Sequence, residues 1–329
     1  MAVSVNEFLK WFRKVDVADV WEATPYVPTF FGSLNIWTPP RGIVGYFHQA
    51  EMVKDKIQFI PTANRGAPGV TRSEPKRKRI TFECPHMPVE LRVTAEDLNN
   101  IDGGDAQSLA NSAGGYLAEQ FRRIRRDAQV TWELHRASML RGVLLDVNGD
   151  TLHNYFTAFG VAEPTIVLAN ATLLKDIENI KRTVGNAMNG EMVEGIHIVC
   201  GTTLYATLRN HADVIANLDT DVNHAFQQKN LVWSQFSVKG ITFVEARGAQ
   251  GATPFMPNAE GRVVLSGTDY YEQLDASATG ISNVGRPGKE VVFTEKILDH
   301  DEGIELRGQF NRLHIMKRPS LLFKVTYTA

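Results

Sequence analysis

The longest regular pattern of apolar and polar positions covers residues 105–141 and predicts one long amphipathic helix. Apolar or small side chains recur there at steps of three, four and seven, which keeps one stripe facing one way. The stripe consists of Leu117, Phe121, Ile124, Ala128, Trp132 and Met139. The polar face is predicted to carry Glu119, Arg122, Arg123, Arg126, Glu133 and Arg136. Asp105 is predicted to be the N-cap residue, and Gly142 is predicted to end the helix just after its last turn.

This helix would be roughly 55 Å long, which is more than a compact domain needs. Gly114 and Gly115 lie in its first third and weaken it, so two shorter helices broken at this pair are an alternative. In either case, the length of the element predicts that something extended lies along it.

The N-terminal part of the chain is predicted to be an arm. Residues 4–15 have the pattern of a short amphipathic helix, which packs on protein or, alternatively, touches a membrane surface. Residues 24–40 are rich in proline and in aromatic side chains, including Phe30, Phe31 and Trp37. The prolines oppose a regular helix, and the aromatics are too many for a solvated linker. An extended arm that lies on another surface satisfies both observations.

Residues 56–60 and 79–83 read as two strands that pair, and the segment between them, residues 61–78, is predicted to be an extension. It is rich in proline, glycine and basic residues, and only Val70 is a sizeable apolar residue, so it cannot form a core of its own. The basic tract 76–79 is a nucleic-acid patch or a solvated, partner-facing loop base, and the near-neutral chain favours the second interpretation.

The remaining patterns alternate helices and strands and indicate an α+β fold. Asn148-Gly149 predicts a type I′ hairpin turn, and Asn170 is predicted to cap a helix that buries Leu173, Ile177, Ile180, Val184 and Met188. Another helix is predicted at 202–212. Further strands are predicted at 151–156, 196–200, 241–246, 262–265, 291–298, 304–316 and 321–327.

Composition narrows the function. The 329 residues are 43% hydrophobic and carry a net charge of −2, so no basic excess would hold nucleic acid non-specifically. No apolar run is long enough to cross a membrane, and two cysteines make no disulfide framework, which favours a reducing compartment. The acidic cluster 299–302 is a metal site or, as we favour, a polar turn between strands. We predict no catalytic, cofactor-binding or metal-binding residues, and Cys200 is predicted to be a buried, inert thiol.

Several short motifs precede the long helix in a fixed order. A strand with Ile57 and Phe59 leads to R-G-A-P-G at 65–69, then to T-F-x-x-P at 81–85 and T-x-x-D-L at 94–98. Together with the upstream Phe30-Phe31 pair, they resemble the major capsid protein E family of tailed phages, the lambda type. The order of elements matches over nearly the whole chain, and the sequence detail over about a sixth of it. The tract 76–79 departs from the family by being more basic.

This resemblance implies the Hong Kong 97-like capsid fold, with an N-terminal arm at 1–48 and an extended β-hairpin loop at 49–85. It also implies a peripheral domain with a long spine helix at 86–190 and 289–329, and an axial domain at 191–288. The function would be that of the major head protein of a tailed phage, in a virion shell assembled in the host cytoplasm. An encapsulin-like compartment shell and a soluble metal-dependent α+β enzyme that uses residues 299–302 are the alternatives.

The expected partners are further copies in hexamers and pentamers, a portal and a possible decoration protein, with packaged DNA contacted weakly and no membrane. We expect the scaffolding protein to be a separate chain, because the aromatic arm begins within about 25 residues of Met1. The predicted interface residues are Arg65, Pro68, Val70, Arg72, Lys76, Arg77 and Lys78 of the loop, with Phe30, Phe31 and Trp37 of the arm.

Overall fold

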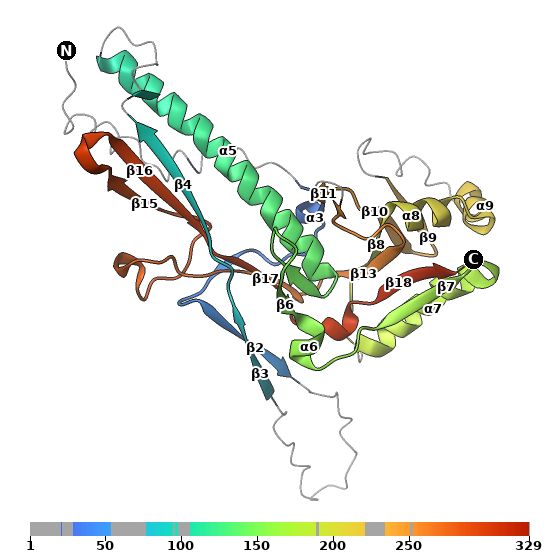
Figure 1. The fold of residues 1–329 in the computed structure, drawn as a ribbon. Helices are drawn as coiled ribbons and strands as arrows, with labels where there is room; N and C mark the ends of the chain where they lie inside the picture. The colour runs from blue at the N-terminus through green and yellow to red at the C-terminus, as the bar shows by residue number, and fades with distance from the viewer. Residues whose placement is uncertain are drawn as a thin grey trace, which may run out of the picture.

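A single long helix, α5 (Ala106–Leu140), organises the molecule, with the other elements arranged along it (Figure 1). The computed structural model describes Trp21 and residues 29–53, 77–94, 96–97, 106–188, 191–220, 234–250 and 253–328. The predicted long helix is confirmed, and it is unbroken at Gly114 and Gly115. The predicted N-cap, Asp105, lies outside the described residues.

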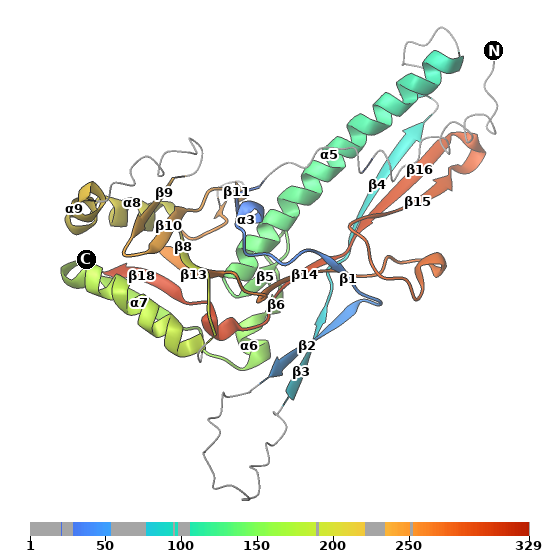
Figure 2. The ribbon, with the colours of Figure 1, turned by 180° about the vertical axis from the view of Figure 1, so that it is seen from behind.

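The outer half of α5 packs on a three-stranded antiparallel sheet of order β15-β16-β4, seen beside the helix in both ribbon views (Figures 1 and 2). These strands are β15 (Val292–Ile297), β16 (Gly303–Phe310) and β4 (Met87–Thr94). The predicted apolar stripe supplies the helix side of this core, and it packs against apolar residues of the strands. The buried members are Trp21, Val93, Leu117, Phe121, Ala128, Trp132, Ile304, Leu306 and Phe310.

The other end of α5 meets a six-stranded mixed sheet of order β7-β18-β13-β8-β10-β9. Its strands are β7 (Thr165–Ala169), β18 (Lys324–Thr328), β13 (Glu260–Ser266), β8 (Gly195–Cys200), β10 (Ile241–Glu245) and β9 (Gln235–Val238). The helices beside it are α7 (Leu173–Met188), α8 (Thr202–Arg209) and α9 (Ala212–Thr220). The buried face of α7 is the one that its sequence predicted.

The order of this sheet joins segments that are distant in the chain. β18 lies between β7, with which it runs parallel from Lys324 opposite Thr165, and β13, with which it is antiparallel. Residues 165–188 and 324–328 therefore share a sheet and its covering helices with residues 195–266. The predicted domain boundaries place these segments in two different domains.

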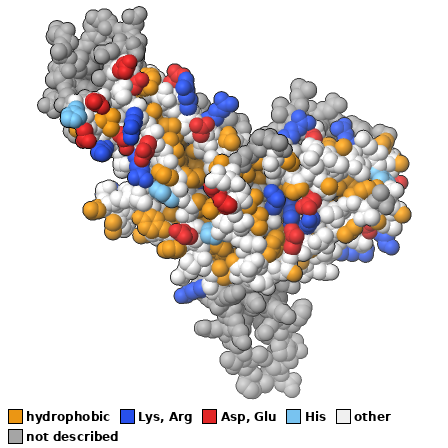
Figure 3. Space-filling view, viewed as in Figure 1, with side chains coloured by type: hydrophobic (Ala, Val, Ile, Leu, Met, Phe, Trp, Pro, Cys, Tyr) orange, Lys and Arg blue, Asp and Glu red, His pale blue; other side chains and the backbone are white. Residues whose placement is uncertain are grey.

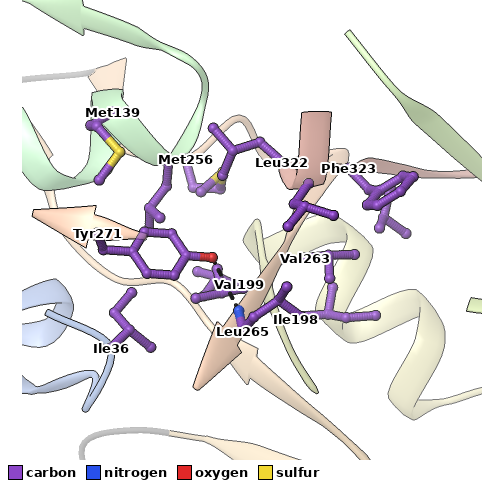
Figure 4. Close-up of a cluster of buried hydrophobic side chains, with 14 of the residues drawn as sticks. Ile36, Met139, Ile198, Val199, Met256, Val263, Leu265, Tyr271, Leu322 and Phe323 are labelled. Carbon is purple, nitrogen blue, oxygen red and sulfur yellow. Dashed lines mark hydrogen bonds between the residues drawn. The ribbon is translucent and has the colours of Figure 1, made fainter. Parts of the chain in front are cut away.

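A small sheet of order β1-β14-β17 connects the two ends of the molecule. It consists of β1 (Arg41–Gly42), β14 (Tyr271–Asp275) and β17 (Arg312–Met316). Figure 4 shows the core where it meets the six-stranded sheet: the Tyr271 ring lies between Ile36 and Met139, and its hydroxyl accepts a hydrogen bond from Leu265 N at 3.1 Å. The short helix α3 (Phe30–Ser33) contacts α5.

A two-stranded hairpin, β2 (Phe47–Val53) with β3 (Arg77–Glu83), projects from the body (Figure 1). Its antiparallel register sets Phe47 opposite Glu83 and Val53 opposite Arg77. The predicted pairing of 79–83 with 56–60 is wrong, because residues 79–83 pair with 47–51. Polar residues at positions 48, 49 and 51 hid the first strand from the sequence pattern, and residues 56–60 lie outside the described part of the chain.

The hairpin after α5 is confirmed, but its turn is not type I′. It joins β5 (Val143–Leu145) to β6 (Thr151–Asn154), and of the two turn residues only Gly149 has a positive φ, 90°.

The predicted capping of α7 by Asn170 is wrong. The Asn170 side chain accepts a hydrogen bond from the Tyr327 hydroxyl at 3.1 Å, and the Asp176 carboxylate accepts one from Ala169 N. The remaining elements are α6 (Tyr155–Phe159), β11 (Ala249–Gln250), β12 (Thr253–Pro254) and the 3-10 turns η1 (Asn170–Thr172), η3 (Ile281–Asn283), η4 (Asp299–Asp301) and η5 (Pro319–Leu321). No helix in the described ranges is long and apolar enough to span a membrane.

We predict that Gly142→Ala destabilises the subunit. Gly142 follows α5 with φ 83°, and a Cβ there would lie 2.0 Å from the Phe156 ring. The left-handed backbone alone costs about 1 kcal/mol or more, and the ring would also have to move. Urea unfolding of the unassembled subunit measures the loss. Gly185→Ala is the matched control: a Cβ there meets nothing within 4 Å, so this change in α7 should stabilise by about 0.5 to 1 kcal/mol. Equal stability of the two variants would contradict the prediction.

Candidate functional site

A group of buried polar side chains lies where the inner part of α5 meets α3, β14 and β17, and we call it the polar junction. Each member is 5% exposed or less, although charged residues are rarely buried unless they are paired. Its members are Glu133, His135, Arg136, Gln273, Asp275, Arg312 and His314. The prediction that Glu133 and Arg136 lie on the wet face of the helix is wrong, because α3 and the small sheet cover that part of it.

Glu133 holds the arm to α5. Its carboxylate accepts hydrogen bonds from the backbone N–H groups of Phe31 and Gly32, the latter at 3.1 Å. Burial raises the pKa of Glu133, while these amides and Arg136, at 3.7 Å, favour its charged form. Trp37 Nε1 donates to Phe31 O at 2.5 Å, which closes the turn formed by the arm. The part of the arm around α3 is thereby fixed to the subunit's own long helix.

Arg312 and Asp275 form a second buried connection, between β17 and β14. They are cross-strand partners, and the guanidinium donates to both carboxylate oxygens, at 2.7 and 2.9 Å. The same guanidinium lies 4.2 Å from the centre of the Trp132 ring on α5. Arg136 Nη2 donates to Gln273 Oε1 at 3.1 Å, so α5 is also bonded directly to β14. Paired, stacked guanidinium groups of this kind fix the relative positions of three elements.

Two histidines complete the polar junction. The centres of the His135 and His314 rings lie 6.0 Å apart. Desolvation lowers the pKa of His135 to about 4, and it lowers that of His314 well below its usual value, assisted by both guanidinium groups. Both rings are therefore neutral at pH 7.

The structure places the predicted interface residues in different settings. Phe30 and Phe31 lie in the core of their own subunit, 6% and 0% exposed, so the prediction that this stretch lies extended on another surface is wrong for them. Trp37 is half-buried and packs edge-on against Tyr271. Arg77 and Lys78 lie in β3. Arg65, Pro68, Val70, Arg72 and Lys76 lie outside the described residues, and the assignment of the loop to an interface stays a prediction.

The acidic cluster is a turn, as we favoured. Asp299–Asp301 forms η4 between β15 and β16, and Leu298 N donates to Gly303 O at 3.0 Å across it. Among the described residues, no three His, Cys, Asp or Glu side chains are placed to hold a metal ion. Cys84 and Cys200 are buried free thiols, and burial raises the pKa of Cys84 to about 12. His86 Nδ1 lies 2.7 Å from Asn311 Oδ1.

The described structure combines a long central helix and buried ion pairs with a projecting hairpin and a docked arm. The family model described as phage major capsid protein E matches residues 15–327, so the chain belongs to that family. It is a major capsid protein of a tailed phage, its fold is Hong Kong 97-like, and its place is the virion shell. The family match favours this function over a compartment shell.

Two solved structures are similar to this chain at low sequence identity, and the first of them supports the fold. The mature capsid of bacteriophage PhiM1 has a TM-score of 0.50 and 12% identity, with 92% of this chain and 88% of that chain covered. A capsid protein described for a prophage of E. coli CFT073 has a TM-score of 0.49 and 14% identity, with 100% of both chains covered. No curated protein sequence is significantly similar to this one.

We predict that Asp275→Ala costs the subunit about 3 to 5 kcal/mol of unfolding free energy, because it leaves the Arg312 charge buried without its carboxylate. Adding Arg312→Met should restore much of this loss by removing the orphaned charge. Chemical unfolding of the two variants measures both effects. The control is Glu305→Ala, which breaks a 3.1 Å ion pair with the mostly exposed Arg92 and should cost less than about 1 kcal/mol. A cost for Asp275→Ala no larger than the control's would refute the role of the pair.

We also predict that the subunit loses stability in acid. The pKa of His135 is lower in the folded chain, about 4, than the ordinary 6.5, so the unfolded chain binds the proton first. The contribution of His135 is complete above pH 6.5, and it is lost as the pH falls from 6.5 towards 4. About 2 kcal/mol should be lost between pH 7.5 and 5 from His135 alone, and His314 acts in the same direction. The raised pKa of Glu133 opposes this effect at the acid end.

Urea unfolding at pH 7.5 and at pH 5 tests the acid prediction. His135→Gln keeps a neutral polar side chain and should remove its share of the difference. A stability that does not change over this range would show that the two imidazoles are not held neutral by the fold.

Proposed function

We propose that copies of this chain form hexamers and pentamers that close an icosahedral shell around double-stranded DNA, with the β2–β3 hairpin as the element that reaches a neighbour. The observation that supports this is the shape of the hairpin. It leaves the body through seven consecutive paired positions, and of its described side chains Ala50 and Phe82 are buried in the core at its root. The segment joining the strands has the composition of a chain that folds only against another surface.

The proposed division of the chain keeps the arm at 1–48, the extended loop at 49–85, and a peripheral unit around the outer half of α5. We assign β7, α7 and β18 to the axial unit with residues 191–266, because all of them share one sheet or cover it. The small sheet with β14 and β17 then forms the connection between the two units. This proposal departs from the predicted boundaries for residues 165–188 and 324–328. It also departs for β14 and β17, which the prediction had placed in the axial and peripheral domains.

Further partners stay proposals: a separate scaffolding chain, a portal and a possible decoration protein. Weak contact with the packaged DNA is supported by the net charge of −2, because phosphate contacts need excess basic groups. Assembly in the host cytoplasm is supported by the two buried free thiols, which form no disulfide. We infer a structural rather than catalytic role, since the acidic cluster that the enzyme alternative requires forms a turn.

Replacing residues 62–74 with a short Gly-Ser turn should leave a folded subunit that no longer forms closed shells. The replaced segment has Val70 as its one sizeable apolar residue, so we expect the circular dichroism spectrum and the thermal unfolding of the free subunit to be nearly unchanged. A shell repeats each contact many times, so the loss of one weak contact is multiplied. Electron microscopy and sedimentation measure the shells.

The matched control shortens another exposed turn, residues 147–149, to two residues. That turn is not proposed to reach a neighbour, so its variant should assemble normally. Stable, closed shells from the variant lacking residues 62–74 would show that the hairpin tip is a passive surface loop.

A further inference from the structure

The loop between β14 and β15 carries two of the most exposed large apolar side chains in the described part of the chain. Ile281 is 95% exposed and Val284 is 79% exposed, and we call this pair the apolar tip. Ile281 is the first residue of the 3-10 turn η3, and Val284 directly follows its last residue. Figure 3 shows hydrophobic side chains gathered on this projecting region, at the left of the molecule.

The loop that carries the apolar tip is held firmly, so this exposure is not a consequence of a loose chain. The amide of Gln309, a buried residue of β16, accepts from Thr279 N at 2.8 Å and from Thr279 Oγ1 at 2.6 Å. Nearer the tip, Asn283 N donates to Gly280 O and Arg286 N donates to Asn283 O, at 3.0 and 3.1 Å. A loop that is already ordered in this way binds a partner without the entropic cost of becoming ordered.

The base of the loop is tied to the chain that leads into the hairpin. Ser277 N donates to Gly45 O at 3.3 Å and Gly288 N donates to Ile43 O at 3.0 Å. A Cβ at Gly288 would lie 2.2 Å from Asp275 O, so the backbones here are in direct contact. The stretch tied down in this way exposes further apolar side chains, namely Val44, Tyr46 and Phe47.

We propose that the apolar tip docks on a second copy of this chain within the shell. This inference rests on the proposed function and adds a contact distinct from the far end of the hairpin. A second copy is the occupant because the family builds its shell from copies of one chain. In addition, the base of the loop that carries the tip is bonded to the chain leading into the hairpin, which is itself proposed to reach a neighbour. The tip and the three apolar residues at the hairpin root are five side chains, too few to supply the ~800 Å² per partner of a stable pair. The free subunit therefore stays soluble, and the contact holds only where a shell repeats it.

Thiol labelling of Ile281→Cys tests the contact directly. The chain has two cysteines, both buried, so the new thiol is the one that reacts readily with a maleimide. We expect rapid labelling in the free subunit and at least a tenfold slower rate in closed shells. The same rate in shells and free subunits would overturn the inference, because the tip would then face solvent or await another protein.

A charge at the apolar tip provides the second readout. The double variant Ile281→Glu with Val284→Glu should unfold at the wild-type temperature, because neither side chain is buried, yet it should form at least tenfold fewer shells. Met192→Glu is the matched control, since Met192 is 93% exposed but lies outside the tip. Normal assembly of the double variant would overturn the inference while leaving the proposed function intact. Failure of the wild-type chain to form shells would instead refute the proposed function.

Discussion

The structure depends on one constraint: charges that are buried at the polar junction must be paired there. Glu133 is satisfied by the amides of the arm and by Arg136, and Arg312 is satisfied by Asp275 and the Trp132 ring. Glu133 requires α3 to be docked on α5, and Arg312 requires β14, β17 and α5, so all of these charges are satisfied together only when the four elements are in place. Apolar packing would tolerate small displacements of these elements, whereas a bidentate pair does not. The junction therefore fixes the angle at which the two cores lie along the helix.

The surfaces proposed to meet other copies are all attached close to this junction. The arm is bonded to Glu133 of α5 through Phe31. It then continues through Trp37 to β1 and leads directly into the root of the hairpin. The loop with the apolar tip begins one residue after Asp275, which itself bonds Arg312. A displacement of either contact element would strain the same set of buried pairs. The two proposed contacts are in this way mechanically connected through the interior of one subunit.

The sequence predicts those parts of the fold that a local pattern encodes. The stripe of α5 and the face of α7 follow from their periods, and Gly142 ends its helix as expected. The same periodicity predicted that Glu133 and Arg136 are exposed to solvent. A periodic pattern identifies the apolar face of a helix, but it cannot show that a second neighbour covers the polar face. The six-stranded sheet was not predictable in its order, since nothing local to residues 324–328 indicates that they pair with both β7 and β13. Phe30 and Phe31 were recognised as unsuited to a linker, yet only the structure shows that their own subunit covers them.

The internal position of β18 has a consequence for protein synthesis. This strand is made after all the others of its sheet, yet it fills the space between β7 and β13. Until β18 has been translated, it cannot connect β7 and α7 to the rest of the sheet, and the edge of β13 that later pairs with β18 is unpaired. The finished sheet can form only when residue 328 has left the ribosome, since strand pairing needs both backbones free. Completion of the six-stranded sheet is thus delayed until this last strand has been translated.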